Sequence, residues 1–154
     1  MFKLLCLLLT FPALAVAVDL PTRKFLNLAA IKTMVAAAEA EAQTRNVQVT
    51  ICIVDESGNL LFLERGDGAA LVTLQFAQKK ARHAVFYKNP SKDGADELKK
   101  GNVDVLAFPD FFPNQGGLPI QVDGQTVGGI AVSGAKSDVD EAIAQSALDA
   151  LLKR

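Results

Sequence analysis

The sequence predicts a single α+β domain in which helices cover an antiparallel sheet. Two hairpin patterns, each a pair of short apolar runs around a glycine-containing turn, lie between stretches with helical periodicity. Strands joined by tight turns run antiparallel, so the pattern argues against the parallel sheet of a doubly wound fold. The length of 154 residues is enough for one ordinary core and too short for two.

Eight elements and one long loop follow from the periodicity and the turn residues. Asn27 can cap a helix, and apolar residues recur after it at spacings of three and four. Pro90 ends the second helix, because the residue before a proline avoids helical dihedrals. Asp123-Gly124 is a strong hairpin turn, and Gly128-Gly129 in the next strand indicates a bulge or a close backbone approach. The expected elements are, in chain order, a helix at 28–45, strands at 48–54 and 60–65, a helix at 71–87, a short helix at 91–100 that Ser91 can cap, an ordered loop at 102–117, strands at 118–122 and 125–132, and a helix at 137–152.

The first 17 residues have the pattern of a secretory signal peptide. A short positive start is followed by an apolar run from Leu4 to Val18, and Ala15 to Ala17 forms a small-x-small cleavage site. The apolar run has about 15 residues, whereas a spanning helix needs roughly 20. We therefore expect cleavage after residue 17, a mature domain of residues 18–154 without a membrane span, and a periplasmic or secreted location.

Composition argues against several functional classes. The 16 basic and 17 acidic residues give a net charge of −1, which argues against a general nucleic-acid binder. Two cysteines and one histidine exclude a disulfide-rich scaffold and a zinc site built from several such ligands. Cys52 lies in an apolar run and is expected to be buried and unreactive. Any chemistry that needs an imidazole must use His83.

Three stretches of the chain carry a family pattern in a fixed order and spacing. They are Ile-Val-Asp-Glu-Ser-Gly-Asn-Leu-Leu at 53–61, Ala-Gln-Lys-Lys-Ala-Arg at 77–82 with Asn-Pro-Ser-Lys at 89–92, and the glycine-rich segment 116–134. The chain thereby resembles the GlcG/HbpS-like haem-binding family, also found as the C-terminal domain of PduO-type proteins. The resemblance implies a profilin-like fold, with a five-stranded antiparallel sheet covered by helices. It also implies an oligomer and haem as the cofactor, in haem sensing or handling.

His83 departs from the family pattern, in which a threonine often follows Lys-Ala-Arg, and it is the candidate iron ligand. An imidazole can bind iron, aromatic rings can cover the macrocycle, and lysine or arginine can meet the propionates. Tyr87 is the second candidate ligand, because a phenolate binds ferric iron. The alternative is a histidine on a solvated, basic helix face. The residues predicted to hold haem are His83, Tyr87, Phe76, Phe86, Lys79 and Arg82, with the further basic residues Lys80 and Lys88 on the same helix.

Two other classes of function remain open. The first is an enzyme that acts on a small metabolite, with Asp55, Glu56, Glu64 and Asp67 near the first hairpin as acid and base. The second is an accessory protein whose oligomer is the functional object, with a possible partner protein in the cell envelope. The apolar helices and the three phenylalanines between 103 and 112 predict a homo-oligomer, because large exposed apolar patches mark interfaces.

Overall fold

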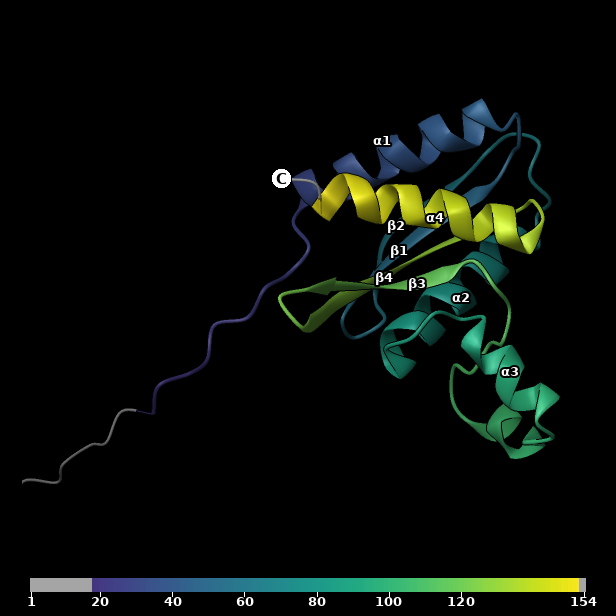
Figure 1. The fold of residues 1–154 in the computed structure, drawn as a ribbon. Helices are drawn as coiled ribbons and strands as arrows, with labels where there is room; N and C mark the ends of the chain where they lie inside the picture. Colours follow the sequence, from purple (N-terminus) through teal and green to yellow (C-terminus); the bar gives the residue numbers. More distant parts are fainter. Residues whose placement is uncertain (1–17, 153–154) are drawn as a thin grey trace, which may run out of the picture.

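The computed structural model describes residues 18–152 and contains a four-stranded antiparallel sheet with helices on both faces (Figure 1). The helices α1 and α4 lie side by side over one face, and α2 covers the other. The order across the sheet is β2-β1-β4-β3. The elements are α1 (Leu28–Thr44), β1 (Thr50–Asp55), β2 (Leu60–Arg65), α2 (Thr73–Tyr87), α3 (Asp93–Lys99), the 3₁₀ helix η1 (Val103–Ala107), β3 (Gly117–Val122), β4 (Gln125–Ser133) and α4 (Ser137–Leu152).

The α+β class and the antiparallel pairing are confirmed, whereas the expected fifth strand is absent from the described residues. The long segment between α3 and β3 forms no strand. Pro109 and Pro113 lack the N–H that a ladder needs, and the segment folds as η1 followed by an ordered loop. Ser91 does not cap α3, which begins two residues later. Its hydroxyl instead donates to the carbonyl of Asn114 and accepts from the N–H of Gly117, so it ties that loop to α2's end.

The layer of α1 and α4 buries the larger of two apolar cores. Isoleucines and valines of β1 and β4 meet apolar stripes on both helices, and alanines on the stripes let the helices approach closely. The stripe of α1 consists of Ile31, Met34, Val35, Ala38 and Ala42, and that of α4 of Ile143, Ala144, Ala147 and Leu148. These apolar stripes are therefore covered within one chain, and they give no support to the predicted oligomer.

On the other face, α2 lies unusually close to the sheet because glycines line its path. A Cβ atom at Gly117 would stand 2.4 Å from the carbonyl oxygen of Lys80, and one at Gly129 would stand 2.5 Å from that of Ala81. The close approach predicted for Gly128-Gly129 is thus confirmed. Cys52 faces α2 and is fully buried, as predicted, and burial raises the pKa of its thiol to about 12. This packing holds α2 rigidly and so positions His83.

Candidate functional site

His83 is buried and has one of its two ring nitrogens already engaged. The residue is only 1% exposed, and Nδ1 accepts a hydrogen bond from the backbone N–H of Phe112 at 2.9 Å. Burial lowers the pKa of His83 below its ordinary 6.5, with the Asn89 side chain and the Asp93 carboxylate opposing the shift. The ring is therefore neutral near pH 7, and because Nδ1 is an acceptor, the proton lies on Nε2.

A cavity of about 210 Å³ opens beside this ring, between α2, α3 and η1. His83 Nε2 and Asn89 Oδ1 are both buried at the cavity, where the Asn89 side chain is the hydrogen-bonding neighbour that opposes the fall in the His83 pKa. Gly94 lets α3 close over the ring, since a Cβ there would lie 3.0 Å from His83 Cε1. The lining residues are His83, Tyr87, Asn89, Asp93, Gly94, Glu97, Val105, Phe108 and Phe111.

Aromatic rings form one wall of the cavity. The ring centroid of His83 lies 4.7 Å from that of Tyr87 and 5.1 Å from that of Phe111, and the last two rings meet edge to face at 5.6 Å. The Tyr87 hydroxyl donates to the carbonyl of Pro109 at 2.8 Å. Burial, together with the nearby Asp110, raises the pKa of Tyr87 above its ordinary value.

The other four predicted residues lie on two different sides of α2. Phe76 packs against Phe112 with centroids 5.5 Å apart, and Lys79 Nζ lies 5.6 Å from the centre of the same Phe112 ring.

Arg82 points elsewhere and is fully engaged. It binds the Asp110 carboxylate through two nitrogens, at 2.6 and 2.9 Å, donates to the carbonyl of Gly58 and lies over the ring of Phe86. The structure thus brings His83 and Tyr87 together and places Phe76 and Lys79 beside Phe112. Arg82 and Phe86 form a third group, apart from these two pairs.

Sequence reasoning missed the residues that close the cavity opposite α2. Asn89 was used only as a helix-stop signal and as part of a family stretch, and Asp93 and Glu97 belong to a helix for which no packing partner was predicted. Asp93 and Glu97 lie three and seven residues past Pro90 and are therefore one helical turn apart, so helical spacing alone could have placed them on one face of α3. Nothing in the local pattern could have shown that this face meets His83, because the contact depends on how α3 folds back onto α2.

An iron ligand at His83 does not fit this geometry. A histidine that binds a metal offers the lone pair of one ring nitrogen to the metal and donates the N–H of the other to the protein. In this structure the lone pair of Nδ1 already accepts from the N–H of Phe112, and the nitrogen that faces the cavity, Nε2, carries the proton. The 210 Å³ cavity is also below the roughly 300–1,000 Å³ of pockets for drug-sized ligands, and a haem is larger than most of these. Asp93 and Glu97 would repel propionates.

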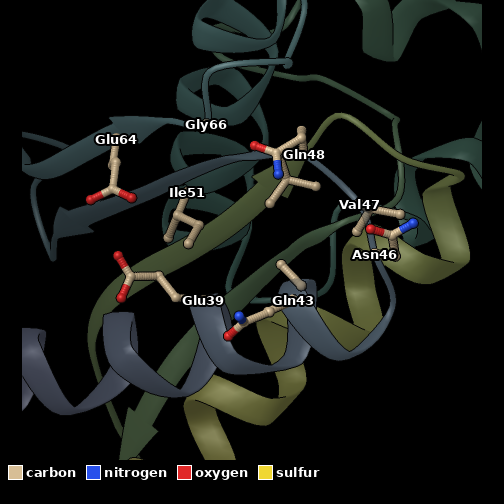
Figure 2. A pocket seen from close by; sticks show the side chains of 10 residues that line it. Glu39, Gln43, Asn46, Val47, Gln48, Ile51, Glu64 and Gly66 are labelled. Atoms are coloured by element: carbon tan, nitrogen blue, oxygen red, sulfur yellow. The ribbon is translucent and has the colours of Figure 1, made fainter.

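A second pocket, of about 340 Å³, lies between α1 and the edge of the sheet. Figure 2 shows the carboxylates of Glu39 and Glu64 facing each other across it. Burial and the hydrogen-bonded, like-charged Glu39 raise the pKa of Glu64. The predicted acid–base cluster at the first hairpin does not form, since Asp55 binds its own turn amides and Glu56 pairs with Arg23 at 2.6 Å.

Residues 18–152 contain neither a metal-binding cluster nor a membrane-spanning helix. No group of three or more His, Cys, Asp or Glu side chains there is arranged to hold a metal ion. Within the same range, no helix has the length and apolar character needed to cross a membrane.

Comparison with known proteins relates the whole described domain to one family. The family described as haem-degrading protein HbpS-like matches residues 26–149. Protein GlcG of Escherichia coli K12 is 32% identical over 112 residues, which are 73% of this chain and 84% of GlcG. A double mutant of Streptomyces reticuli HbpS has a TM-score of 0.81 and 31% identity, covering 94% of this chain and 99% of that one.

A solved PduOC–heme complex is also similar, with a TM-score of 0.77, 29% identity, and coverage of 82% of this chain and 95% of that one. The matches to the family, to GlcG and to the solved structures each cover most of the chain. The predicted resemblance is thereby confirmed, and the chain belongs to the HbpS-like family.

Proposed function

We propose that this protein binds haem or a related tetrapyrrole and acts in haem handling or sensing outside the cytoplasm. The observation that carries the proposal is the similarity over most of the chain to the PduOC–heme complex, at 29% identity. The description of its family as haem-degrading and HbpS-like supports the same ligand. Fold alone is a weak guide to activity, so the proposal depends on a surface that suits the ligand.

The segment 103–112 offers such a surface. Val103, Leu106 and Phe108 are 62, 59 and 52% exposed, although all three are strongly apolar. An apolar surface of this kind suits the flat face of a macrocycle better than it suits water. Lys79 stands over Phe112 at the end of the segment and makes none of the described ion pairs, so its ammonium can meet a propionate. We place haem on this surface, outside the His83 cavity.

Titration of hemin into the mature chain, followed by visible absorption, tests the proposal. A folded mature protein that leaves the hemin spectrum unchanged would refute it. The double variant Leu106→Ser/Phe108→Ser should bind about tenfold more weakly, or about 1.4 kcal/mol. Leu71→Ser is the matched control, because Leu71 is 76% exposed on a different segment and its loss should not affect the titration.

His83→Ala decides between the surface and the cavity in the same assay. With haem on the surface, the variant keeps the wild-type spectrum and affinity. Loss of a nitrogen-ligand signature, with binding weakened tenfold or more, would support the sequence-based prediction that His83 binds the iron. It would also overturn the argument from the Phe112 hydrogen bond.

Export is the other part of the proposal. The pattern of residues 1–17 supports it, and these residues lie outside the described part of the chain. Expression of the full chain in its natural host, followed by N-terminal sequencing, tests it. A mature protein that begins at Val18 and is recovered from the periplasm or medium is the expected result. An intact Met1 in the cytoplasmic fraction would contradict it.

A further inference from the structure

Arg82 connects α2 to the segment 103–112 through its guanidinium group. Nε and Nη2 donate to the two carboxylate oxygens of Asp110, at 2.6 and 2.9 Å. Nη1 donates to the carbonyl of Gly58 at 3.0 Å, and the centre of the Phe86 ring lies 5.1 Å from the guanidinium carbon. Two parallel hydrogen bonds fix the orientation of a carboxylate as well as its distance. Asp110 is therefore held in one place relative to α2.

Asp110 occupies the most demanding position of a tight turn. The turn runs from Phe108 to Phe111, and the N–H of Phe111 donates to the carbonyl of Phe108 at 3.3 Å. Pro109 is its second residue, and Asp110, the third, has a φ of 56°. Glycine and asparagine adopt a positive φ at this position most easily, and other residues keep it where their surroundings hold them. The pair with Arg82 supplies such a restraint.

The same turn carries the apolar surface proposed for haem. Phe108 begins the turn, Leu106 lies two residues before it, and both side chains are exposed. Side chains this exposed gain too little from packing to fix the backbone that carries them. A loop that is already ordered loses less conformational entropy when a ligand binds, so its affinity is higher. The polar anchor at Asp110 can thus keep this surface ready for a ligand.

We propose that Arg82 is a positioning residue for the haem surface, which it holds through Asp110 without touching the ligand. The inference rests on the proposed function. It replaces the role expected from the sequence, in which Arg82 meets a propionate, because the guanidinium is already bound to Asp110 and Gly58. The two roles predict opposite effects of removing the Asp110 charge. Loss of a positioning pair weakens hemin binding, whereas release of the guanidinium toward a propionate strengthens it.

Hemin titrations of Asp110→Asn, Arg82→Gln and Arg82→Lys separate the two roles. Asn has nearly the shape of Asp and suits a positive φ, so Asp110→Asn removes the ion pair and spares the turn. We expect about tenfold weaker binding by Asp110→Asn and by Arg82→Gln, with an unchanged spectrum of bound hemin, because no iron ligand is lost. Arg82→Lys keeps the charge but cannot bind both oxygens, so it should be weakened as well. The double variant Arg82→Gln/Asp110→Asn should stay within about twofold of the weaker single variant, since the pair acts as a unit.

Arg45→Gln is the matched control. Arg45 pairs with Glu41 at 2.6 Å on α1, and the two side chains are 39 and 31% exposed, close to the 38 and 27% of Arg82 and Asp110. Ion pairs this exposed contribute little to global stability, so all the variants should stay folded by far-UV circular dichroism. Arg45→Gln should leave hemin binding unchanged, because α1 covers the other face of the sheet from α2.

Hydrogen exchange of the Phe112 amide tests the positioning without hemin. This N–H donates to His83, so its exchange rate reports whether the segment stays on α2. It should exchange about tenfold faster in Asp110→Asn and at the wild-type rate in Arg45→Gln.

The outcomes separate this inference from the proposed function. If wild type binds hemin, then equal or tighter binding by Asp110→Asn, full binding by Arg82→Lys, or an unchanged Phe112 exchange rate in Asp110→Asn would each overturn the positioning role alone. A wild-type protein that does not bind hemin would overturn both proposals.

Discussion

The buried ion pair between Lys80 and Asp140 is the most exacting test of this structure. Lys80 Nζ lies 3.0 Å from Asp140 Oδ2 and 3.0 Å from the carbonyl oxygen of Val132, and the two side chains are 2 and 3% exposed. Burial lowers the pKa of Lys80, while the adjacent Asp140 opposes the shift. The pair therefore ties α2 to the first turn of α4 in the absence of solvent.

The variant Lys80→Met removes the charge and keeps nearly the same length, so little cavity is created. Asp140 keeps one hydrogen bond, from the N–H of Ala135 to Oδ1, but Oδ2 is left buried without its cation. Removal of one partner of a buried pair costs about 3–5 kcal/mol. We expect a loss of this size, which corresponds to at least about a hundredfold change in the unfolding equilibrium constant.

Urea unfolding of the mature protein followed by far-UV circular dichroism measures this loss, because the chain has no tryptophan to report by fluorescence. Lys79→Met, at the adjacent exposed position, is the control and should stay within about 0.5 kcal/mol of wild type. The double variant Lys80→Met/Asp140→Leu should recover a large part of the loss, since no buried charge remains unpaired. A Lys80→Met protein within about 1 kcal/mol of wild type would refute the reasoning.

Three other predictions concern pH, like charges and assembly. Because burial lowers the pKa of His83 in the folded state, the unfolded chain binds a proton first as the pH falls, and the free energy of unfolding should decrease below about pH 6.5. Urea titrations of folded His83→Gln from pH 7 to 5 should lack this contribution to the pH dependence. Glu64→Gln should raise the free energy of unfolding by a few tenths of a kcal/mol at pH 7, because it removes repulsion from Glu39. The gain should vanish near pH 4, and a loss of stability at pH 7 would contradict the prediction. Light scattering should find an oligomer for the mature protein, as its apolar helices and phenylalanine-rich loop predict. A monomer of the wild-type protein at micromolar concentration would rule this out.

Features controlled by neighbouring residues were determined by the sequence alone. Asn27 caps α1 as predicted, with its side-chain oxygen accepting from the N–H of Ala30 at 2.8 Å. Asp123 and Gly124 both have positive φ, as a two-residue hairpin turn requires. The apolar stripe of α1 also followed from spacing. In each case the contacts that decide the outcome lie within a few residues, so a local pattern contains them.

The candidate site was decided only by tertiary structure. In the sequence, Lys80 belongs to a basic stretch of helix, yet it is buried against Asp140, sixty residues later. His83 is the residue that the sequence singled out, but its role depends on Phe112, Asn89 and the fold of α3, none of which its own helix specifies. A hydrogen bond from a distant backbone amide sets which nitrogen carries the proton, and the packing of α3 sets the size of the cavity. Both are long-range contacts, and the chemistry of the imidazole follows from them.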